Sequence, residues 1–476
     1  MNIILLTPSR RFIANRAGLG YQIPLGLVLI GGPLLDVGHQ VQLIDNDVLG
    51  LNDEQLINRL KGHAPECIMI GHSGSTAAHP VAMQTAQSLR QAFPQTYIIY
   101  GGVYPSYTAQ KILDENPCLD VIVQGEGEET VLELVAALEC SRGALRLVKG
   151  ITWRSVNNIV SNPRRAMIND LDRFRPGWEL VDWSQYQMFG FGISAGMQFS
   201  RGCTLSCTYC GQWSFWRKWR HRSVKNFVEQ LEVLAHDFGV NIVWFADENF
   251  AVDQLLVRQI FEAVIERNLG LSFNLNMTAA DVVRDAELLP LYKQAGVDNI
   301  ILGIEFLDDV NVEQVRKNNP YTLSLEAIRL LRKHGIVSLV NIIYGLETEN
   351  ISSLGRTYQN LIKLDPDILN AVYITPHHWT IDGRKINSEQ IIQPLQSYWT
   401  YRNQVLVTPK LRPWLLFTMV KITEIFFHLR PKALWRLCFG ADHRYRKIMR
   451  AYQKVGIKVI LAEIYEFLFM TKFKSL

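Results

Sequence analysis

Three of the seven cysteines in this 476-residue chain fall within eight residues. Cys203, Cys207 and Cys210 follow one another at spacings of four and then three residues. Thiolates grouped this tightly are soft metal ligands, and three of them can hold three irons of a cubane [4Fe-4S] cluster. The fourth iron then stays open to another ligand. The spacing therefore predicts an iron–sulfur cluster with one iron available for chemistry.

Two other interpretations of the cysteine group remain open. A structural zinc site or an electron-transfer cluster takes four ligands, so zinc would require His221 or a distant residue as the fourth. The second interpretation is that the three cysteines occur close together by chance. The remaining cysteines are scattered without a disulfide-like pattern, which favours a reducing, cytoplasmic setting. They are Cys67, Cys118, Cys140 and Cys438.

The pattern C-x-x-x-C-x-x-C, with the aromatic Tyr209 directly before its last cysteine, resembles the cluster loop of radical S-adenosylmethionine (SAM) enzymes. The resemblance implies that the methionine part of SAM chelates the open iron. An electron from the cluster then cleaves a carbon–sulfur bond, and the resulting deoxyadenosyl radical takes a hydrogen atom from the substrate. It also implies that Tyr209 packs near the adenine, although shielding of the cluster would equally explain this tyrosine.

The first 140 residues alternate short apolar runs with helical stretches. This alternation predicts an α/β fold with a parallel, doubly wound sheet over residues 1–140. Pro24 can open its first helix and Gly38 can close it. The expected strands are Met1–Leu6, Val41–Ile44, Ile68–Ile70, Tyr97–Tyr100 and Val121–Val123.

Loops rich in small residues follow three of these strands, where ligands of parallel sheets bind. Their order, with G-G-x-x-P and G-E-G-E elements, resembles the cobalamin-binding domain that precedes many radical SAM enzymes. Tight turns would explain any one loop alone. The D-x-H-x-x-G segment that supplies a histidine to cobalt elsewhere is absent, so we expect no lower histidine ligand from that motif. The resemblance assigns Ser73, Gly101, Gly102, Gly125, Glu126 and Gly127 to cobalamin.

Residues 141–190 are expected to connect this domain to a second one over residues 191–390. Six strand–helix units predict a partial parallel (β/α)6 barrel, the fold of the radical SAM core, whose ligands sit at the carboxyl ends of the strands. By resemblance, Glu305 contacts the SAM ribose, and Asp247 lies where the SAM amino group binds. An exposed glutamate at the barrel rim is the alternative for Glu305. The expected strands are Gly192–Arg201, Ile242–Phe245, Ser272–Asn276, Ile300–Ile304, Val337–Ile343 and Leu369–Ile374.

Aromatic residues and histidines occur at two further places near the expected barrel mouth. His377, His378 and Trp379 follow the sixth strand and are candidates to contact substrate or to donate a proton, because histidine titrates near neutral pH. A structural or solvated histidine pair is the alternative. A second group, just past the cysteines, could stack on a flat ligand or pack over the barrel mouth. It consists of Trp213, Phe215, Trp216 and Trp219.

The chain as a whole is nearly neutral, with 49 Lys and Arg against 45 Asp and Glu, which argues against a nucleic-acid partner. Residues 402–454, however, hold twelve Lys and Arg against only Glu424 and Asp442. Apolar residues there recur at helical spacing, so residues 391–476 are expected to form a basic helical extension. Together with this extension, the chain resembles the anaerobic magnesium-protoporphyrin IX monomethyl ester cyclase family along nearly its whole length.

That resemblance implies an oxygen-independent ring closure on a tetrapyrrole in (bacterio)chlorophyll biosynthesis. The radical would attack the methyl-esterified propionate, a water-derived oxygen would be introduced, and the isocyclic ring would close. It also implies a reductant protein such as flavodoxin or ferredoxin. The alternatives are a cobalamin-dependent C-methyltransferase acting on a lipid, tetrapyrrole or natural product, and a non-catalytic cobalamin or iron–sulfur sensor.

No secretory signal or membrane-spanning helix is expected from the sequence. The apolar start Ile3–Leu6 is short and soon meets charge, and the uncharged span Ala17–Leu35 carries five glycines and two prolines. We therefore expect a cytoplasmic enzyme. Its basic C-terminal helices could contact a membrane surface, although a solvated helix face is the commoner explanation of such charge.

Overall fold

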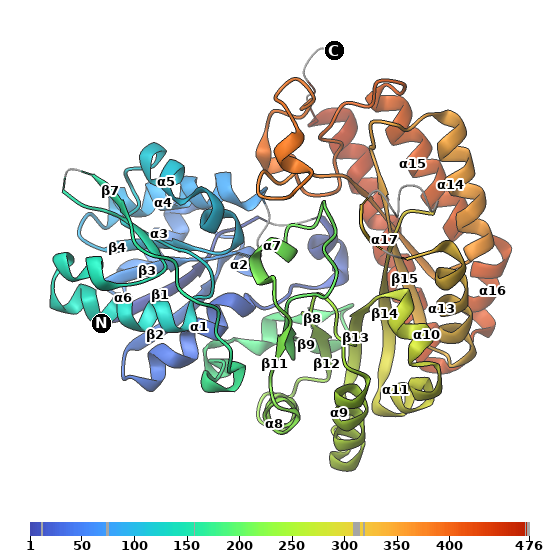
Figure 1. Cartoon of the computed structure of the whole chain (residues 1–476), viewed down its shortest axis with the longest axis horizontal. Coiled ribbons are helices and arrows are strands. Elements are labelled where there is room, and N and C mark those ends of the chain that lie inside the picture. The colour runs from blue at the N-terminus through green and yellow to red at the C-terminus, as the bar shows by residue number, and fades with distance from the viewer. Residues whose placement is uncertain are drawn as a thin grey trace. The chain divides into compact units, whose positions relative to one another are not determined.

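The computed structural model describes the chain except residues 11–12, 73–75, 157, 308–314, 318, 472 and 474–476. It divides into two compact units. The first comprises residues 1–12 and 21–185, and the second comprises residues 13–20 and 186–476. Figure 1 shows the elements of both units.

The first unit is built on a seven-stranded sheet of order β2-β1-β3-β4-β5-β6-β7. The first five strands are parallel, as the sequence predicts. They are β1 (Asn2–Thr7), β2 (Gln40–Asp45), β3 (Cys67–Ile70), β4 (Tyr97–Gly101) and β5 (Val121–Val123). Residues 3–6 of the central strand β1 are fully buried, which explains its unbroken apolar run.

Helices lie on both faces of this sheet, which confirms the doubly wound fold (Figure 1). Helix α1 packs against α6, and α3 packs against α4. The elements are η1 (Asn15–Leu19, part of the second unit), α1 (Leu25–Asp36), α2 (Asn46–Leu49), α3 (Asp53–Lys61), α4 (Ala78–Ala92), α5 (Val103–Glu115), α6 (Glu128–Cys140) and η2 (Arg142–Leu147).

Part of the segment 141–190 belongs to this sheet. Strand β6 (Ile151–Arg154) pairs antiparallel with β5, and β7 (Ile159–Ser161) pairs antiparallel with β6. The following residues pack on α1 at Gly32, where a Cβ atom would lie only 2.2 Å from the carbonyl oxygen of Arg175. The segment thus completes the first unit structurally, while the domain boundary near residue 140 stays a prediction. Its short helices are η3 (Leu171–Arg173), η4 (Trp178–Leu180) and η5 (Trp183–Gln185).

The second unit holds a sheet of order β16-β15-β14-β13-β12-β9-β8, in which all strands but β8 are parallel. These six parallel strands form the partial barrel that the sequence predicts. The strands are β8 (Gln187–Met188), β9 (Gly192–Met197), β12 (Ile242–Phe245), β13 (Ser272–Met277), β14 (Val297–Glu305), β15 (Val337–Tyr344) and β16 (Ile368–Tyr373). The expected strand Gly192–Arg201 is interrupted after Met197 and resumes as β10 (Ser200–Arg201), which pairs with β11 (Arg220–His221).

Helices connect these strands and form the C-terminal extension (Figure 1). The connecting helices are α7 (Trp213–Trp216), α8 (Val224–His236), α9 (Gln254–Arg267), α10 (Ala279–Arg284), η6 (Ala286–Leu288), α11 (Leu289–Ala295), α13 (Tyr321–Lys333) and α14 (Ile351–Leu364). The elements after β16 are η7 (Gly383–Lys385), η8 (Gln396–Tyr398), α15 (Pro413–His428), α16 (Pro431–Phe439) and α17 (His443–Phe469).

Helix α17 packs onto the barrel sheet near the start of strands β15 and β16. Tyr445 and Met449 of this helix are buried in one apolar cluster with Val337, Leu339 and Ile368. This leaves the opposite, carboxyl ends of the strands for the cysteine loop and its surroundings.

Candidate active site

The cysteine loop is closed at its base by a two-stranded ribbon. Strand β10 before the loop pairs with β11 after it. Between them Gly202 has a φ of +94°, and a Cβ atom there would lie 2.5 Å from the carbonyl oxygen of Lys218. Only glycine allows this approach of the two ends. The backbone thus presents residues 203–210 as one loop beyond the first barrel strand.

The three cysteines of this loop lie close enough to influence one another electrostatically. Burial raises the pKa of all three thiols, that of Cys207 to about 11, and the charge of Cys210 raises the pKa of both Cys203 and Cys207. The backbone N–H of Cys210 donates to the carbonyl oxygen of Cys207 at 3.2 Å, which forms a tight turn. Three half-buried or buried thiols on one short loop suit a soft metal cluster, whose positive charge favours deprotonated thiols.

Within the described part of the chain, no three His, Cys, Asp or Glu side chains are placed as a ready metal-binding group. The zinc alternative gains no support from His221. Its Nδ1 lies 2.8 Å from the carbonyl oxygen of Arg222, and its ring packs between Phe199 and Trp219. The cysteines therefore stay the predicted cluster ligands on the strength of their spacing and proximity.

Asp247 and Glu248, at the end of β12, hold the base of the loop. Asp247 is buried and accepts hydrogen bonds from the backbone N–H and hydroxyl of Ser200, both at 2.6 Å, and from the N–H of Phe199 at 3.1 Å. Burial raises its pKa to about 6. Both carboxylate oxygens are thus engaged within the protein, and an additional contact between Asp247 and SAM stays a prediction.

Glu248 lies nearer the cysteines than the sequence suggests. Its carboxylate accepts a hydrogen bond from the N–H of Gly202 at 3.2 Å, and burial raises its pKa to about 7. Its charge also raises the pKa of Cys203 and Cys210. The sequence does not single out Glu248, because the directions of side chains beyond the end of a strand cannot be read from it.

Glu305 and Tyr209 come together at the carboxyl end of β14. A register shift between Leu302 and Glu305, and a φ of +58° at Glu305, turn this carboxylate out of the regular strand alternation. Glu305 forms an ion pair with Lys317, whose ammonium group lies 3.5 Å from the Tyr209 hydroxyl. Burial raises the pKa of Tyr209 well above its usual value.

Lys317 is the residue that sequence reasoning missed in this group. It follows the segment 308–314, outside the described residues, and no motif marks it. Its side chain is buried, and its positive charge lowers the pKa of the three cysteines, opposing the effect of burial. The positive charge of this lysine thus stabilises nearby anions, both thiolates and a carboxylate.

The loop after β16 packs directly on the cysteine loop. The Trp379 indole N–H donates to the carbonyl oxygen of Gly211 at 2.8 Å, and the ring of His377 stacks on that of Trp379. Burial lowers the pKa of His377 to about 4, so this histidine is neutral at physiological pH and is poorly suited to donate a proton. Contact of substrate with exposed His378, His377 or Trp379 stays a prediction.

A cavity of about 440 Å³ opens at the carboxyl ends of β14, β15 and β16. Tyr209 and Phe306 line it beside Gly345, and Asp382 and Lys385 bring charge to it. A cavity of this size beside the cysteine loop suits a small-molecule ligand. The loop Trp213–Trp216, by contrast, forms the short helix α7, in which Trp216 lies under the Arg201 guanidinium.

The expected cobalamin residues follow β3, β4 and β5 of the first unit. Gly102 precedes α5 with a φ of +119°, and Gly125 has a φ of +79° with no atom within 4 Å of a would-be Cβ. The Gly125 N–H donates to the Ser106 hydroxyl at 2.9 Å. Gly101 ends β4, and Gly127 directly precedes α6. Because glycine has no side chain, a ligand can approach the backbone of these loops closely.

Other residues of these loops have partners within the unit. The carboxylate of Glu126 accepts from the N–H of Ile168 at 2.6 Å. Nε2 of His72 lies 2.6 Å from the Tyr100 hydroxyl, and burial lowers the pKa of His72 well below its usual value. Ser73 lies outside the described residues. The assignment of all these residues to cobalamin stays a prediction.

Comparisons with known proteins agree with this arrangement. The model of the radical SAM superfamily matches residues 197–361, and that of the B12-binding domain matches residues 13–135. An uncharacterised methyltransferase of Pyrococcus horikoshii is 25% identical over 91% of this chain and 94% of its own length. The solved structure of the cobalamin-dependent SAM radical enzyme OxsB superposes with a TM-score of 0.71 at 18% identity, covering 97% of this chain and 72% of that one.

The most informative relative is an anaerobic magnesium-protoporphyrin IX monomethyl ester cyclase of Synechocystis sp. It is 39% identical over 98% of this chain and 94% of its own length. The similarity thus includes the B12-binding region, the radical SAM region and the C-terminal extension. Both family models and this full-length match make the chain a cobalamin-dependent radical SAM enzyme, and it belongs to the family of anaerobic magnesium-protoporphyrin IX monomethyl ester cyclases.

Proposed function

We propose that this protein closes the isocyclic ring of magnesium-protoporphyrin IX monomethyl ester without oxygen. The observation that carries the proposal is the 39% identity to a cyclase over nearly the entire length of both chains. The methyltransferase relative is more distant, at 25% identity. The fold adds support, because it places a three-cysteine loop and a cavity at the same end of one partial barrel.

The chain's own residues would hold and orient the reacting groups. When bound to a cluster on the three cysteines, SAM supplies a deoxyadenosyl radical that removes a hydrogen atom from the substrate. Tyr209 would pack near the adenine, and Glu305 would accept hydrogen bonds from the ribose hydroxyls. Lys317 would hold the Glu305 carboxylate in place through their ion pair. The walls of the cavity would exclude water from the radical.

The substrate and partners follow from the proposed reaction. A tetrapyrrole with one free propionate carries an anionic group, and Lys385 at the cavity offers a cation for it. Electrons would come from a small reductant protein such as flavodoxin or ferredoxin. We place the enzyme in the cytoplasm, with a membrane contact through its basic C-terminal helices.

The decisive experiment is an anaerobic assay of the full chain. The protein is reconstituted with iron, sulfide and cobalamin and supplied with reductant, SAM and magnesium-protoporphyrin monomethyl ester. Products are then identified by mass spectrometry. We expect deoxyadenosine together with a pigment that has gained oxygen and lost hydrogen.

Other products of the assay would indicate a different function. A methylated product with S-adenosylhomocysteine would establish a methyltransferase. Deoxyadenosine with an unchanged porphyrin would retain the radical enzyme but reject this substrate. Absence of SAM cleavage by a fully reconstituted protein would favour the sensor.

A further inference from the structure

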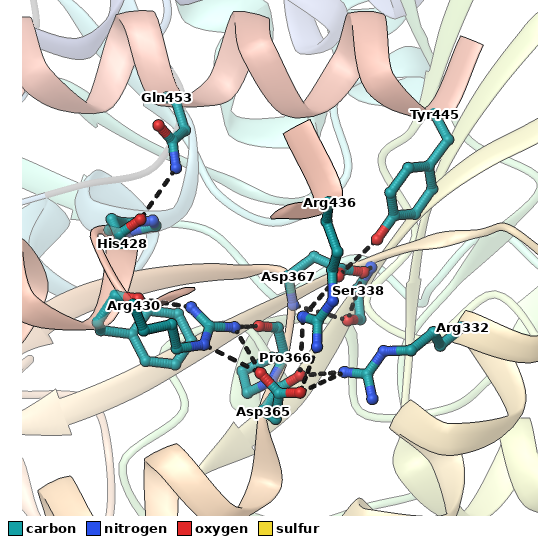
Figure 2. Close-up of polar contacts among 11 residues, drawn as sticks. Arg332, Ser338, Asp365, Pro366, Asp367, His428, Arg430, Arg436, Tyr445 and Gln453 are labelled. Atoms are coloured by element: carbon teal, nitrogen blue, oxygen red, sulfur yellow. Dashed lines mark hydrogen bonds and ion pairs between the residues drawn. The ribbon is translucent and has the colours of Figure 1, made fainter. Parts of the chain in front are cut away.

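Helices α15 and α17 form an antiparallel pair at the surface of the second unit. The rings of Phe417 and Phe467 stack with their centroids 4.0 Å apart. One turn further along, Lys421 forms an ion pair with Glu463. At the other end of α15, the side chain of Gln453 donates to the carbonyl oxygen of His428 at 3.2 Å (Figure 2). The residue numbers rise on one helix as they fall on the other, so the pair is antiparallel.

Each helix of the pair has an exposed apolar stripe opposite its buried side. Apart from two adjacent pairs, successive exposed residues lie three, four or eight positions apart, which places them on one face of each helix. On α15 and at its end they are Trp414, Ile422, Ile425, Phe426 and Leu429; on α17 they are Ile457, Leu461, Tyr465, Leu468 and Phe469. These side chains are between 37% and 71% exposed, far from the burial expected of such residues.

The two stripes face the same way. On α15 the buried residues Val420 and Phe427 lie opposite the stripe, and on α17 Val455 and Val459 do so. Since both helices bury these sides and meet along the seam between them, both stripes point away from the protein interior. Trp435 and Phe439 of the neighbouring helix α16 are exposed as well. We call this surface, formed by the exposed apolar residues of α15, α16 and α17, the C-terminal apolar face.

The exposed charged side chains of the stretch that carries the C-terminal apolar face have one sign. Among residues 410–470, the exposed charged side chains are all basic, and they are Lys410, Arg412, Lys432, Arg444, Lys447, Arg450, Lys454 and Lys458. The acids of this stretch are buried or half-buried. Glu424 and Glu463 pair with Lys421, and Asp442 pairs with Lys293 at 3.1 Å. The face therefore offers apolar surface and positive charge together.

We propose that the C-terminal apolar face docks on an anionic lipid bilayer. Aromatic and aliphatic side chains would enter the headgroup region while the neighbouring lysines and arginines contact anionic headgroups. A second copy of this chain fits less well, because two identical faces would bring like charges together. No helix among the described residues is both long and apolar enough to span a bilayer, so the contact we propose is interfacial. The proposal stands apart from the reaction that the enzyme catalyses.

Flotation with lipid vesicles tests this contact. The reconstituted full chain is mixed anaerobically with vesicles of phosphatidylcholine alone or with phosphatidylglycerol added. We expect flotation with the anionic vesicles that weakens as salt rises. The triple variant Phe426→Ser, Trp435→Ser, Leu461→Ser should lose flotation at every salt concentration. The double variant Lys454→Glu, Lys458→Glu should bind anionic vesicles at least about tenfold more weakly.

Matched substitutions on other helices serve as controls. Leu255→Ser on α9 and Lys225→Glu on α8 also change exposed residues and should float as the unaltered chain does. All variants should keep their melting temperature and their rate of SAM cleavage. The proposal fails if the unaltered chain does not float with anionic vesicles, or if the triple variant floats equally well. It also fails if the chain sediments as a dimer that the triple variant abolishes, because a second copy would then occupy the face.

Discussion

Cys203, Cys207 and Cys210 are buried or half-buried thiols whose pKa values lie above the ordinary range, so a bare loop holds its protons. Their deprotonation needs a compensating positive charge, which iron would supply. Lys317 provides only part of it. At the scale of single residues, the loop is therefore better suited to a metal cluster than to free, reactive cysteines.

Substitution of any one of the three cysteines should abolish SAM cleavage. We expect Cys203→Ala, Cys207→Ala and Cys210→Ala each to lose the cluster's visible absorption and deoxyadenosine formation, with the far-UV circular dichroism unchanged. A cluster short of one ligand is not retained. Cys438→Ala and Cys67→Ala, outside the loop, should do much less. If the rate of SAM cleavage falls only a few-fold in the loop variants, the predicted cluster is contradicted.

His428, at the end of α15, should contribute to acid sensitivity. Burial lowers its pKa to about 4, whereas an unfolded histidine titrates near 6.5. Between these values the unfolded chain binds a proton that the folded chain does not, so stability falls as the pH drops from 6.5 to 4. This histidine alone accounts for about 3 kcal/mol of lost stability by pH 4.

The variant His428→Gln should therefore lose less stability than the unaltered chain over this pH range. Urea unfolding at pH 7 and at pH 4.5 measures the difference, and exposed His443→Gln is the matched control. Buried His377 and half-buried His79 also have pKa values near 4, so both chains will remain acid-sensitive. Identical pH profiles for the His428→Gln variant and the unaltered chain would show that folding does not lower the pKa of His428.

At the scale of elements, Asp365 fastens the C-terminal helices to the barrel. Figure 2 shows its carboxylate facing Arg332 of α13 together with Arg430 and Arg436 of the C-terminal extension. Burial raises the pKa of Asp365, but these arginines outweigh it and hold the pKa below its usual value. Nearby, Asp367 accepts from the Tyr445 hydroxyl of α17 at 2.6 Å. One short connection before β16 thus joins the helices α13, α16 and α17.

The variant Asp365→Asn should destabilise the second unit by about 3–5 kcal/mol, because it leaves buried guanidinium groups without their counter-charge. Asparagine also tolerates the left-handed backbone of this position, φ +54°, so the effect should come from charge and not from strain. Thermal unfolding measures the loss. Arg258→Gln, in an exposed ion pair on α9, should change the midpoint little. Equal effects of the two substitutions would contradict this role of Asp365.

At the scale of the whole molecule, the two predicted cofactor sites belong to different units. The contacts of Asp247, Trp379 and Asp382 with the cysteine loop and its flanking residues all lie in the second unit. The glycine loops after β4 and β5 lie in the first unit. Loading of one cofactor should therefore be separable from loading of the other.

The variant Gly102→Ala should bind cobalamin about tenfold more weakly and keep its cluster. Its φ of +119° is strained for any side chain, by about 1–3 kcal/mol, whereas the added Cβ makes only an ordinary 3.6 Å contact. Cys210→Ala should show the reverse pattern. Absorption spectra and iron and cobalt contents of the purified proteins measure both. Gly143→Ala, away from the predicted loops, should lose neither cofactor, and loss of both from either test variant would contradict separable loading.

The sequence by itself determined the strands and the chemical type of the site. Apolar runs bounded by turns marked the five parallel strands of the first sheet and the six of the second, because burial on both faces leaves a local signal. The cysteine spacing is equally local. The strands β6 and β7 were missed because they have only four and three residues, and because β7 is a partly exposed edge strand without a continuous apolar run.

Only the tertiary structure decided which side chains surround the cysteine loop. The loop is approached by three residues that lie far from it in the sequence, namely Lys317, Glu248 and Trp379. No sequence periodicity connects them to the loop. Parallel strands gather their carboxyl ends at one edge, but the direction of each side chain beyond a strand depends on bulges and left-handed residues such as Glu305. Such geometry arises from packing between distant segments, which a one-dimensional pattern does not record.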